Sequence, residues 1–215
     1  MKIGVLASHE GTTLQAIIDA CRTGALRASV AAVICNNRDA GALRRAREAG
    51  IRAYHLSSQT HVDPAALDSA IRDALVSADV DLVVLAGYMR RLGTRTLSRF
   101  RGRVINTHPA LLPKFGGQGM YGMNVHRAVL AAGETTTGVS VHLVTEDYDA
   151  GPVLTRCTVP VLPTDTAETL ARRVQARERA FVVEVLAAIA DGRLRLASEE
   201  KGDGRPAEAD QTPPA

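Results

Sequence analysis

The sequence predicts an α/β protein with a mostly parallel central sheet and helices on both faces. Short apolar runs alternate with longer amphipathic stretches through most of the 215 residues. Such alternation is typical of strand–helix units whose strands pair in parallel. The run 82–86 is aliphatic throughout, which favours a central strand buried on both faces. These two observations together predict a Rossmann-like arrangement.

Hydrophobic periodicity and helix-end residues define the expected elements. Leu14, Ile17, Ile18 and Cys21 recur at spacings of three and four, as in an amphipathic helix. Strands are expected at 2–7, 30–35, 52–56, 82–86, 103–106, 137–144 and 153–159. Helices are expected at 12–23, 40–49, 64–78, 94–100, 125–132 and 166–190.

Several of these helices carry recognisable termini. Asp63 followed by Pro64 combines an N-cap with a proline suited to a first turn. Gly50 ends the second helix, and Gly192 ends the last one, which we expect Thr164 or Asp165 to cap. We expect one domain over residues 1–195 and a disordered tail over 196–215, where Pro, Glu, Asp and Gly are frequent.

Composition and charge narrow the function classes. The 26 basic and 23 acidic residues leave a net charge of +3, and no Lys/Arg run marks a nucleic-acid stripe. Aromatic residues are only 3% of the chain, so a base-stacking platform is not expected. No apolar run is long enough for a membrane span, and no export signal precedes the first strand. We therefore expect a cytoplasmic protein with reduced cysteines, a small anionic substrate, and no nucleic-acid or membrane partner.

The carboxyl ends of the expected parallel strands are where a ligand should bind. This rule selects four loops, each with polar residues beside an apolar strand: 8–13, 87–92, 106–113 and 145–151. The first leads directly into a helix, so its free N–H groups form an anion site or, alternatively, an ordinary hydroxyl-rich cap. The GxGxxG spacing at Gly117, Gly119 and Gly122 follows no strand directly, so we expect a mobile loop there and not a nucleotide site.

Asn106 and His108 form the sharpest local pattern. Residues two apart on a strand point the same way, so the amide and the imidazole can converge on one atom as oxyanion donors. Asp149 could reach the same place from the loop 145–151 and keep His108 charged. The histidines at 55, 61, 126 and 142 are scattered, with no metal-ligand spacing, so no metal is expected.

Four segments resemble motifs of the folate-dependent formyltransferases. Residues 106–114, NTHPALLPK, are similar to the family's N-x-H-P-S/A-L-L-P-K signature. Residues 85–90, LAGYMR, resemble L-A-G-[FY]-M-R, while 138–142 and 149–152 are similar to G-x-[ST]-V-H and D-x-G-P. The resemblance runs in order over about 1–195. It implies the formyltransferase fold and formyl transfer from 10-formyltetrahydrofolate to the amine of glycinamide ribonucleotide, a step of purine biosynthesis.

The resemblance also implies roles for individual residues. Asn106, His108 and Asp149 match the catalytic trio of the family. Gly11, Thr12 and Thr13 fall on its phosphate-binding loop, and Glu178 matches a residue near the substrate's ribose. The residues that match the folate-binding segments are Met89, Arg90, Arg91, Leu92, Asn106, Thr145 and Asp149.

Three departures from the family pattern concern the acceptor. His9 and Thr13 replace a glycine and an asparagine of the phosphate loop, Pro64 stands where many members have an arginine, and the segment 116–124 is longer. We expect Lys114 to supply the missing cation. Three alternatives are a different amine acceptor, hydrolysis of the formyl donor, and a binding module without chemistry. Hydrolysis is typical of relatives with an added N-terminal domain, for which we expect no room before Lys2. We expect a monomer or a homodimer.

Overall fold

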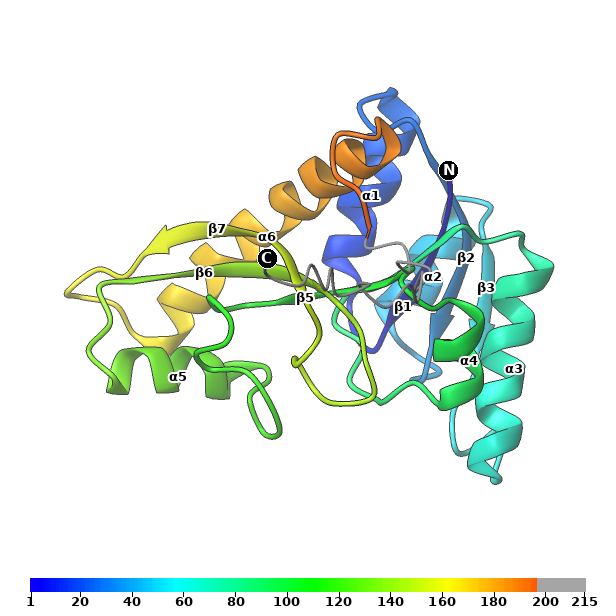
Figure 1. The fold of residues 1–215 in the computed structure, drawn as a ribbon, viewed down its shortest axis with the longest axis horizontal. Coiled ribbons are helices and arrows are strands. Elements are labelled where there is room, and N and C mark those ends of the chain that lie inside the picture. The colour runs from blue at the N-terminus through cyan, green and yellow to red at the C-terminus, as the bar shows by residue number, and fades with distance from the viewer. Residues whose placement is uncertain (197–215) are drawn as a thin grey trace, which may run out of the picture.

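A seven-stranded sheet runs through the protein, with helices packed against it (Figure 1). The computed structural model describes residues 1–196. The strands are β1 (Lys2–Ala7), β2 (Ser29–Cys35), β3 (Arg52–His55), β4 (Leu82–Leu85), β5 (Val104–His108), β6 (Thr136–Leu143) and β7 (Val153–Pro160). The helices are α1 (Thr12–Thr23), α2 (Gly41–Glu48), α3 (Pro64–Ser77), α4 (Thr94–Arg99), α5 (Met123–Ala131) and α6 (Ala167–Ala190).

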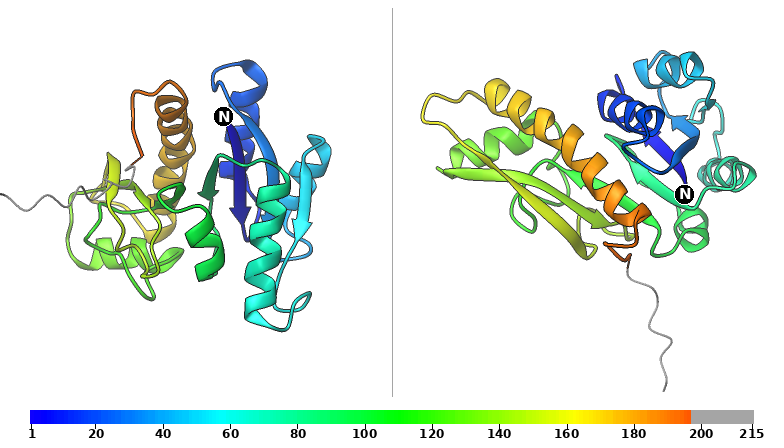
Figure 2. Two further views of the ribbon diagram at one scale, coloured as in Figure 1. Left: turned by 45° about the vertical axis from the view of Figure 1, so that its right-hand side comes forward. Right: turned by 90° about the horizontal axis from the view of Figure 1, so that it is seen from above.

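The strand order β3-β2-β1-β4-β5-β6-β7 divides the sheet into two parts. The first five strands pair in parallel, whereas β6 and β7 are antiparallel to their neighbours. The antiparallel part extends to one side of the parallel body, as the two further views show (Figure 2). The predicted fold class is therefore confirmed, including its mostly parallel sheet.

The side chains of alternate strand residues pack into two separate hydrophobic cores, one on each face of the sheet. On one face, residues such as Val5, Val84 and Ile105 pack with α1, α2 and α6. On the other face, residues such as Leu6 and Val83 pack with α3 and α4. Strands buried on both faces explain the near-continuous aliphatic runs of the sequence.

The structure corrects two element boundaries that bear on the site. The fifth strand continues two residues beyond the expected 103–106, so His108 lies within β5 and not in the loop after it. Thr166, not Thr164 or Asp165, caps α6; its hydroxyl accepts the amide of Thr169, and Asp165 binds Arg173 instead. Leu196 packs against the first core, and the rest of the expected tail lies outside the described residues.

Within residues 1–196, no helix is long and apolar enough to cross a membrane.

Candidate active site

The strand pair β5–β6 places four polar side chains on one face of the sheet. Asn106 lies opposite His142, and His108 lies opposite Ser140. The Asn106 amide Nδ2 is 3.1 Å from Nε2 of His142, whose Nδ1 donates to the carbonyl oxygen of Leu143 at 2.8 Å. This contact fixes the orientation of the Asn106 amide relative to the His142 ring.

Asp149 enters from the loop between β6 and β7 and joins both histidines. Its Oδ2 lies 3.4 Å from His108 Nδ1, and its Oδ1 lies 3.4 Å from His142 Nε2. The Gly117 N–H donates to Oδ2 at 3.0 Å. Asp149 has a φ of 53°, a left-handed conformation that is unusual for a side chain other than glycine. The backbone bends there so that the carboxylate turns toward the two imidazoles.

The electrostatics of the trio are set first by burial. Burial lowers the pKa of His108, although the Asp149 charge and the Phe115 carbonyl act in the opposite direction. Burial acts to raise the pKa of Asp149. The two neighbouring imidazoles and the Gly117 amide act in the opposite direction with a larger combined effect, so the pKa of Asp149 lies below its usual range. Asp149 therefore raises the pKa of His108 as expected, yet it does not outweigh desolvation. The direction of the His108 pKa does not support the expectation that Asp149 keeps this imidazole charged near neutral pH.

The His108 ring also contacts the segment that follows the signature loop. Its Nε2 donates to the carbonyl oxygen of Phe115 at 2.7 Å. Phe115 has a φ of 57°, and two residues later Gly117 binds Asp149. Residues 115–117, here called the closing turn, therefore bond to both catalytic candidates. The loop before this turn is held by Ser140, whose hydroxyl donates to Ala110 O and accepts from Leu112 N.

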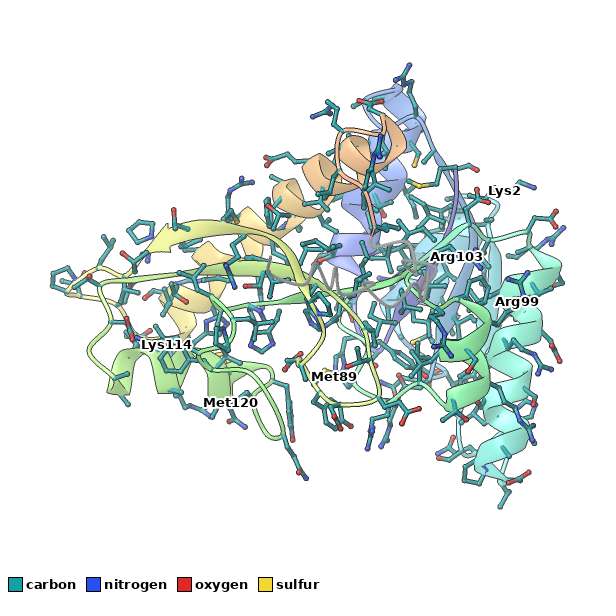
Figure 3. The ribbon with its side chains drawn as sticks, viewed as in Figure 1. Lys2, Met89, Arg99, Arg103, Lys114 and Met120 are labelled. Atoms are coloured by element: carbon teal, nitrogen blue, oxygen red, sulfur yellow. The ribbon has the colours of Figure 1, made fainter. Side chains whose placement is uncertain are left out.

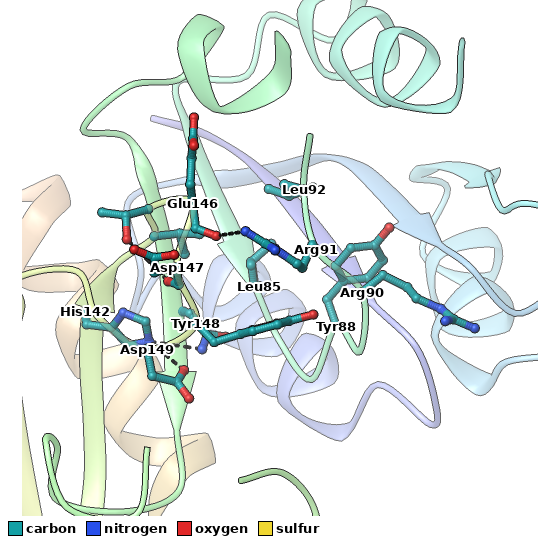
Figure 4. Close-up of a pocket in the computed structure, with 13 residues that line it drawn as sticks. Leu85, Tyr88, Arg90, Arg91, Leu92, His142, Glu146, Asp147, Tyr148 and Asp149 are labelled. Atoms are coloured by element: carbon teal, nitrogen blue, oxygen red, sulfur yellow. Dashed lines mark hydrogen bonds and ion pairs between the residues drawn. The ribbon is translucent and has the colours of Figure 1, made fainter. Parts of the chain in front are cut away.

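A pocket opens beside this group, between the end of β4 and the loop 145–149 (Figure 4). Arg91 crosses it: its guanidinium donates to the Glu146 carbonyl and lies 5.3 Å from the centre of the Tyr148 ring. This contact joins the two expected folate-binding segments. The lining residues are Leu85, Tyr88, Arg90, Arg91, Leu92, Asn106, His142, Val144, Thr145, Glu146, Asp147, Tyr148 and Asp149.

The loop 87–93, here called the donor loop, is fixed at both ends by buried polar side chains. At its start the Met89 N–H donates to Ser8 Oγ at 2.7 Å, and that hydroxyl donates to Asn36. At its end the Asp68 carboxylate accepts the amides of Arg95 and Thr96, which caps α4 from a different helix. Both Ser8 and Asp68 are buried, so neither anchor is free to contact a ligand.

The expected phosphate loop lies at the start of α1. Gly11 has a φ of 68°, and a Cβ there would lie 2.8 Å from Ala42 Cα, so the position requires glycine. No side chain from the described part of the chain caps α1, which leaves its first N–H groups available to an anion. Thr12 is exposed whereas Thr13 is buried. The expected second hydroxyl is thus less accessible than the first.

Glu178 approaches the site from the opposite face of the sheet. Thr107 lies between Asn106 and His108 but points the other way, and its hydroxyl donates to Glu178 Oε1 at 2.6 Å. Burial raises the pKa of Glu178, an effect that the Thr107 bond partly offsets. α6, which carries Glu178, packs against α1, so Glu178 and the phosphate loop belong to elements that share one face.

The structure brings most predicted residues together, with three exceptions. Met89 lies outside the pocket lining, and only its backbone is held. Lys114 forms an ion pair with Glu134 at 2.8 Å and lies beside α5 (Figure 3), which does not support it as the replacement cation. Pro64 is the first residue of α3, where Asp63 caps the helix. Conversely, His142 lies in the site, although the spacing of the histidines gave no reason to place it there. The feature of the sequence that could have indicated it is a histidine near the end of the apolar run that forms β6.

In residues 1–196 no cluster of three or more His, Cys, Asp or Glu side chains is arranged to hold a metal ion.

Known proteins resemble this chain over nearly its whole described length. A family model described as formyl transferase matches residues 1–186, and the chain belongs to that family. Phosphoribosylglycinamide formyltransferase of Escherichia coli K12 is 41% identical over 196 residues, which cover 91% of this chain and 90% of the relative. The expected family and enzyme class are thereby confirmed.

Solved structures support the same assignment. Glycinamide ribonucleotide transformylase 1 from Symbiobacterium toebii superposes with a TM-score of 0.85 at 42% identity, covering 92% of this chain and 91% of the other. A formyltetrahydrofolate deformylase from Pseudomonas syringae gives a TM-score of 0.78 at 26% identity, covering 91% of this chain and 63% of the other. The parallel body and its antiparallel extension are therefore the architecture of this family.

Proposed function

We propose that this chain transfers a formyl group from 10-formyltetrahydrofolate to the amine of glycinamide ribonucleotide. The observation that carries the proposal is the convergence of Asn106, His108 and Asp149 at the edge of the pocket behind the donor loop. The names of the relatives support the acceptor, and the name of the deformylase neighbour supports a folate donor.

The two substrates would approach from two sides of β5. The pocket lined by Arg90, Arg91 and Leu92 would hold the folate on the side that Asn106 faces. The acceptor phosphate would bind the N–H groups of Gly11, Thr12 and Thr13, where the α1 dipole favours an anion. Glu178 would accept hydrogen bonds from the acceptor's ribose. The formyl carbon and the amine would then meet beside Asn106 and His108.

Chemistry would proceed by direct attack. The amine lone pair forms a bond to the formyl carbon, and the carbonyl oxygen becomes an oxyanion. Asn106 Nδ2 and His108 Nε2 are the available N–H donors for that charge. The bond to the folate nitrogen then breaks, and the proton lost by the amine passes through the Asp149 carboxylate, or a water beside it, to that nitrogen.

His108 can donate only after the closing turn has moved. In the structure its Nε2–H is donated to Phe115 O, so the formyl oxygen must replace that carbonyl. The Nε2–H is present both in the neutral tautomer that is protonated at Nε2 and in the charged ring. A lowered His108 pKa is therefore compatible with this role.

A formyl-transfer assay with glycinamide ribonucleotide against a panel of simple amines tests the proposal. Transfer to glycinamide ribonucleotide with the highest kcat/KM supports it, with the dephosphorylated nucleoside as the matched substrate. Release of formate at the same rate with and without any amine would instead identify a hydrolase. Preferred transfer to another amine would leave the donor assignment in place and replace the acceptor.

A further inference from the structure

Thr107 occupies a position in β5 that the reaction itself does not use. It lies between Asn106 and His108, yet strand alternation turns its side chain to the other face, toward α6. Its hydroxyl meets Glu178 Oε1 at 2.6 Å, the short distance of an O–H donor on a charged carboxylate. One strand thus carries the oxyanion donors on one face and the partner of Glu178 on the other.

The Glu178 carboxylate has few other partners. No hydrogen bond from a described residue other than Thr107 reaches it. The charged or titratable groups that act near it are Arg179 on its own helix and the Cys157 thiol on β7. A part-buried carboxylate without a bonded cation loses solvation, and a ligand hydroxyl could offset part of that loss. Oε2 is therefore the oxygen available to a ligand.

We propose that Thr107 is a positioning residue, which holds Glu178 Oε1 so that Oε2 faces the vicinal hydroxyls of the acceptor's ribose. The inference rests on the proposed function, in which Glu178 contacts the acceptor sugar. Because Thr107 is bonded through the backbone to Asn106 and His108, it fixes the sugar contact relative to the oxyanion donors. A donor on a carboxylate also favours its ionised form, so Thr107 keeps Glu178 an acceptor of hydrogen bonds.

The test compares Thr107→Val with Thr107→Ser and with a matched control, Thr137→Val. Thr137 is another buried threonine, on β6, and its hydroxyl has no partner within the described residues. Thr107→Val should raise the KM for glycinamide ribonucleotide by about 10-fold or more, the size of one lost bond to a charged group. The KM for the folate should not change, and kcat should change much less. Thr107→Ser should restore the acceptor KM, and Thr137→Val should resemble the wild type.

Two further measurements separate positioning from a general structural effect. The Glu178 carboxyl is titrated by NMR of the ¹³C-labelled protein; its pKa should rise in Thr107→Val, because the lost bond favoured the ionised form. As the pH is lowered, the acceptor KM of Thr107→Val should therefore begin to rise at a higher pH than that of the wild type, because Glu178 is protonated earlier. An acceptor that lacks one ribose hydroxyl should bind the wild type poorly and lose little more in Thr107→Val.

The outcomes divide clearly. An unchanged Glu178 pKa and an unchanged acceptor KM in Thr107→Val overturn the positioning role, even if the wild type is fully active. A wild type that does not formylate glycinamide ribonucleotide overturns the proposed function and the ribose role with it. A shifted Glu178 pKa without any change in KM would show that the bond exists but does not serve the acceptor, which also refutes the inference.

Discussion

Two loops border the site, and they are held in opposite ways. The donor loop is fixed by Ser8 and Asp68, buried side chains that contact no substrate in the proposed mechanism. The closing turn is bonded instead to His108 and Asp149, the groups proposed to perform the chemistry. The first loop is therefore part of the framework, whereas the second must exchange its bonds with those of the substrate.

Because the two loops are held differently, mutations at their anchors should affect different properties of the protein. Removing an anchor of the donor loop leaves buried donors without partners and reduces stability. Removing a partner of the closing turn removes a group that is proposed to be catalytic and at the same time releases the turn. The following predictions, from the largest effect to the smallest, test whether the two loops can be told apart in this way.

Replacing either oxyanion donor should have the largest effect. Asn106→Ala or His108→Ala should lower kcat by about 10²–10³, the usual cost of one lost donor. His108→Ala should also speed amide hydrogen exchange in residues 115–117, which lose a bond, whereas Asn106→Ala should not. Steady-state kinetics and exchange mass spectrometry measure the two effects. A loss of only a few-fold in both variants would contradict the assignment of the oxyanion site.

Removing the anchor at the end of the donor loop should act on stability. Asp68 is buried and accepts three hydrogen bonds from Arg95 and Thr96, so Asp68→Ala should lower the free energy of unfolding by about 2–4 kcal/mol. The KM for the folate should rise, with kcat nearly unchanged. Asp73→Ala on the same helix is the control, since that carboxylate is exposed and, among residues 1–196, pairs only with Arg72. Equal denaturation midpoints for the two variants would refute the framework role.

Asp149→Asn should reveal the electrostatic link to His108. The Asp149 charge raises the His108 pKa against the effect of burial, so its removal should lower that pKa further. An NMR titration of the imidazole Cε1–H measures the shift, and turnover should fall by about 10–100-fold with the lost proton relay. A His108 titration identical to that of the wild type would mean that the carboxylate does not act on this ring.

The smallest effect is a gain. Burial raises the Glu178 pKa, so the folded protein loses stability as the pH rises from the carboxyl's ordinary pKa to this raised one, and the loss persists at higher pH. Glu178→Gln should therefore raise the melting temperature at neutral pH, by about 2–4 °C for ~1 kcal/mol in a chain of this length. The gain should vanish at acidic pH, where Glu178 is protonated in both states. A lower melting temperature at neutral pH would show that the carboxylate stabilises the fold.

The sequence predicted the parallel body well, because each of its strands and helices is defined by local periodicity and local termini. It could not predict the partner of Asn106. His142 lies opposite Asn106 only because β6 pairs antiparallel with β5 in one register, and nothing in the connection between the two strands, its helix α5 included, specifies that register. The sequence could not predict the partner of Lys114 either. Its partner, Glu134, is 20 residues away on a turn that no pattern relates to it.

The pairing register of β5 and β6 has a consequence for how this chain can change. Since Asn106, His108 and His142 are aligned by strand pairing, the connection between the two strands sets little of their relative position. Residues 118–122 of that connection can therefore gain or lose length without displacing the amide from the imidazole. Natural variation and engineered insertions should therefore be tolerated there. A short peptide inserted at that point should affect the closing turn, which it follows directly, and leave the pairing of β5 with β6 intact.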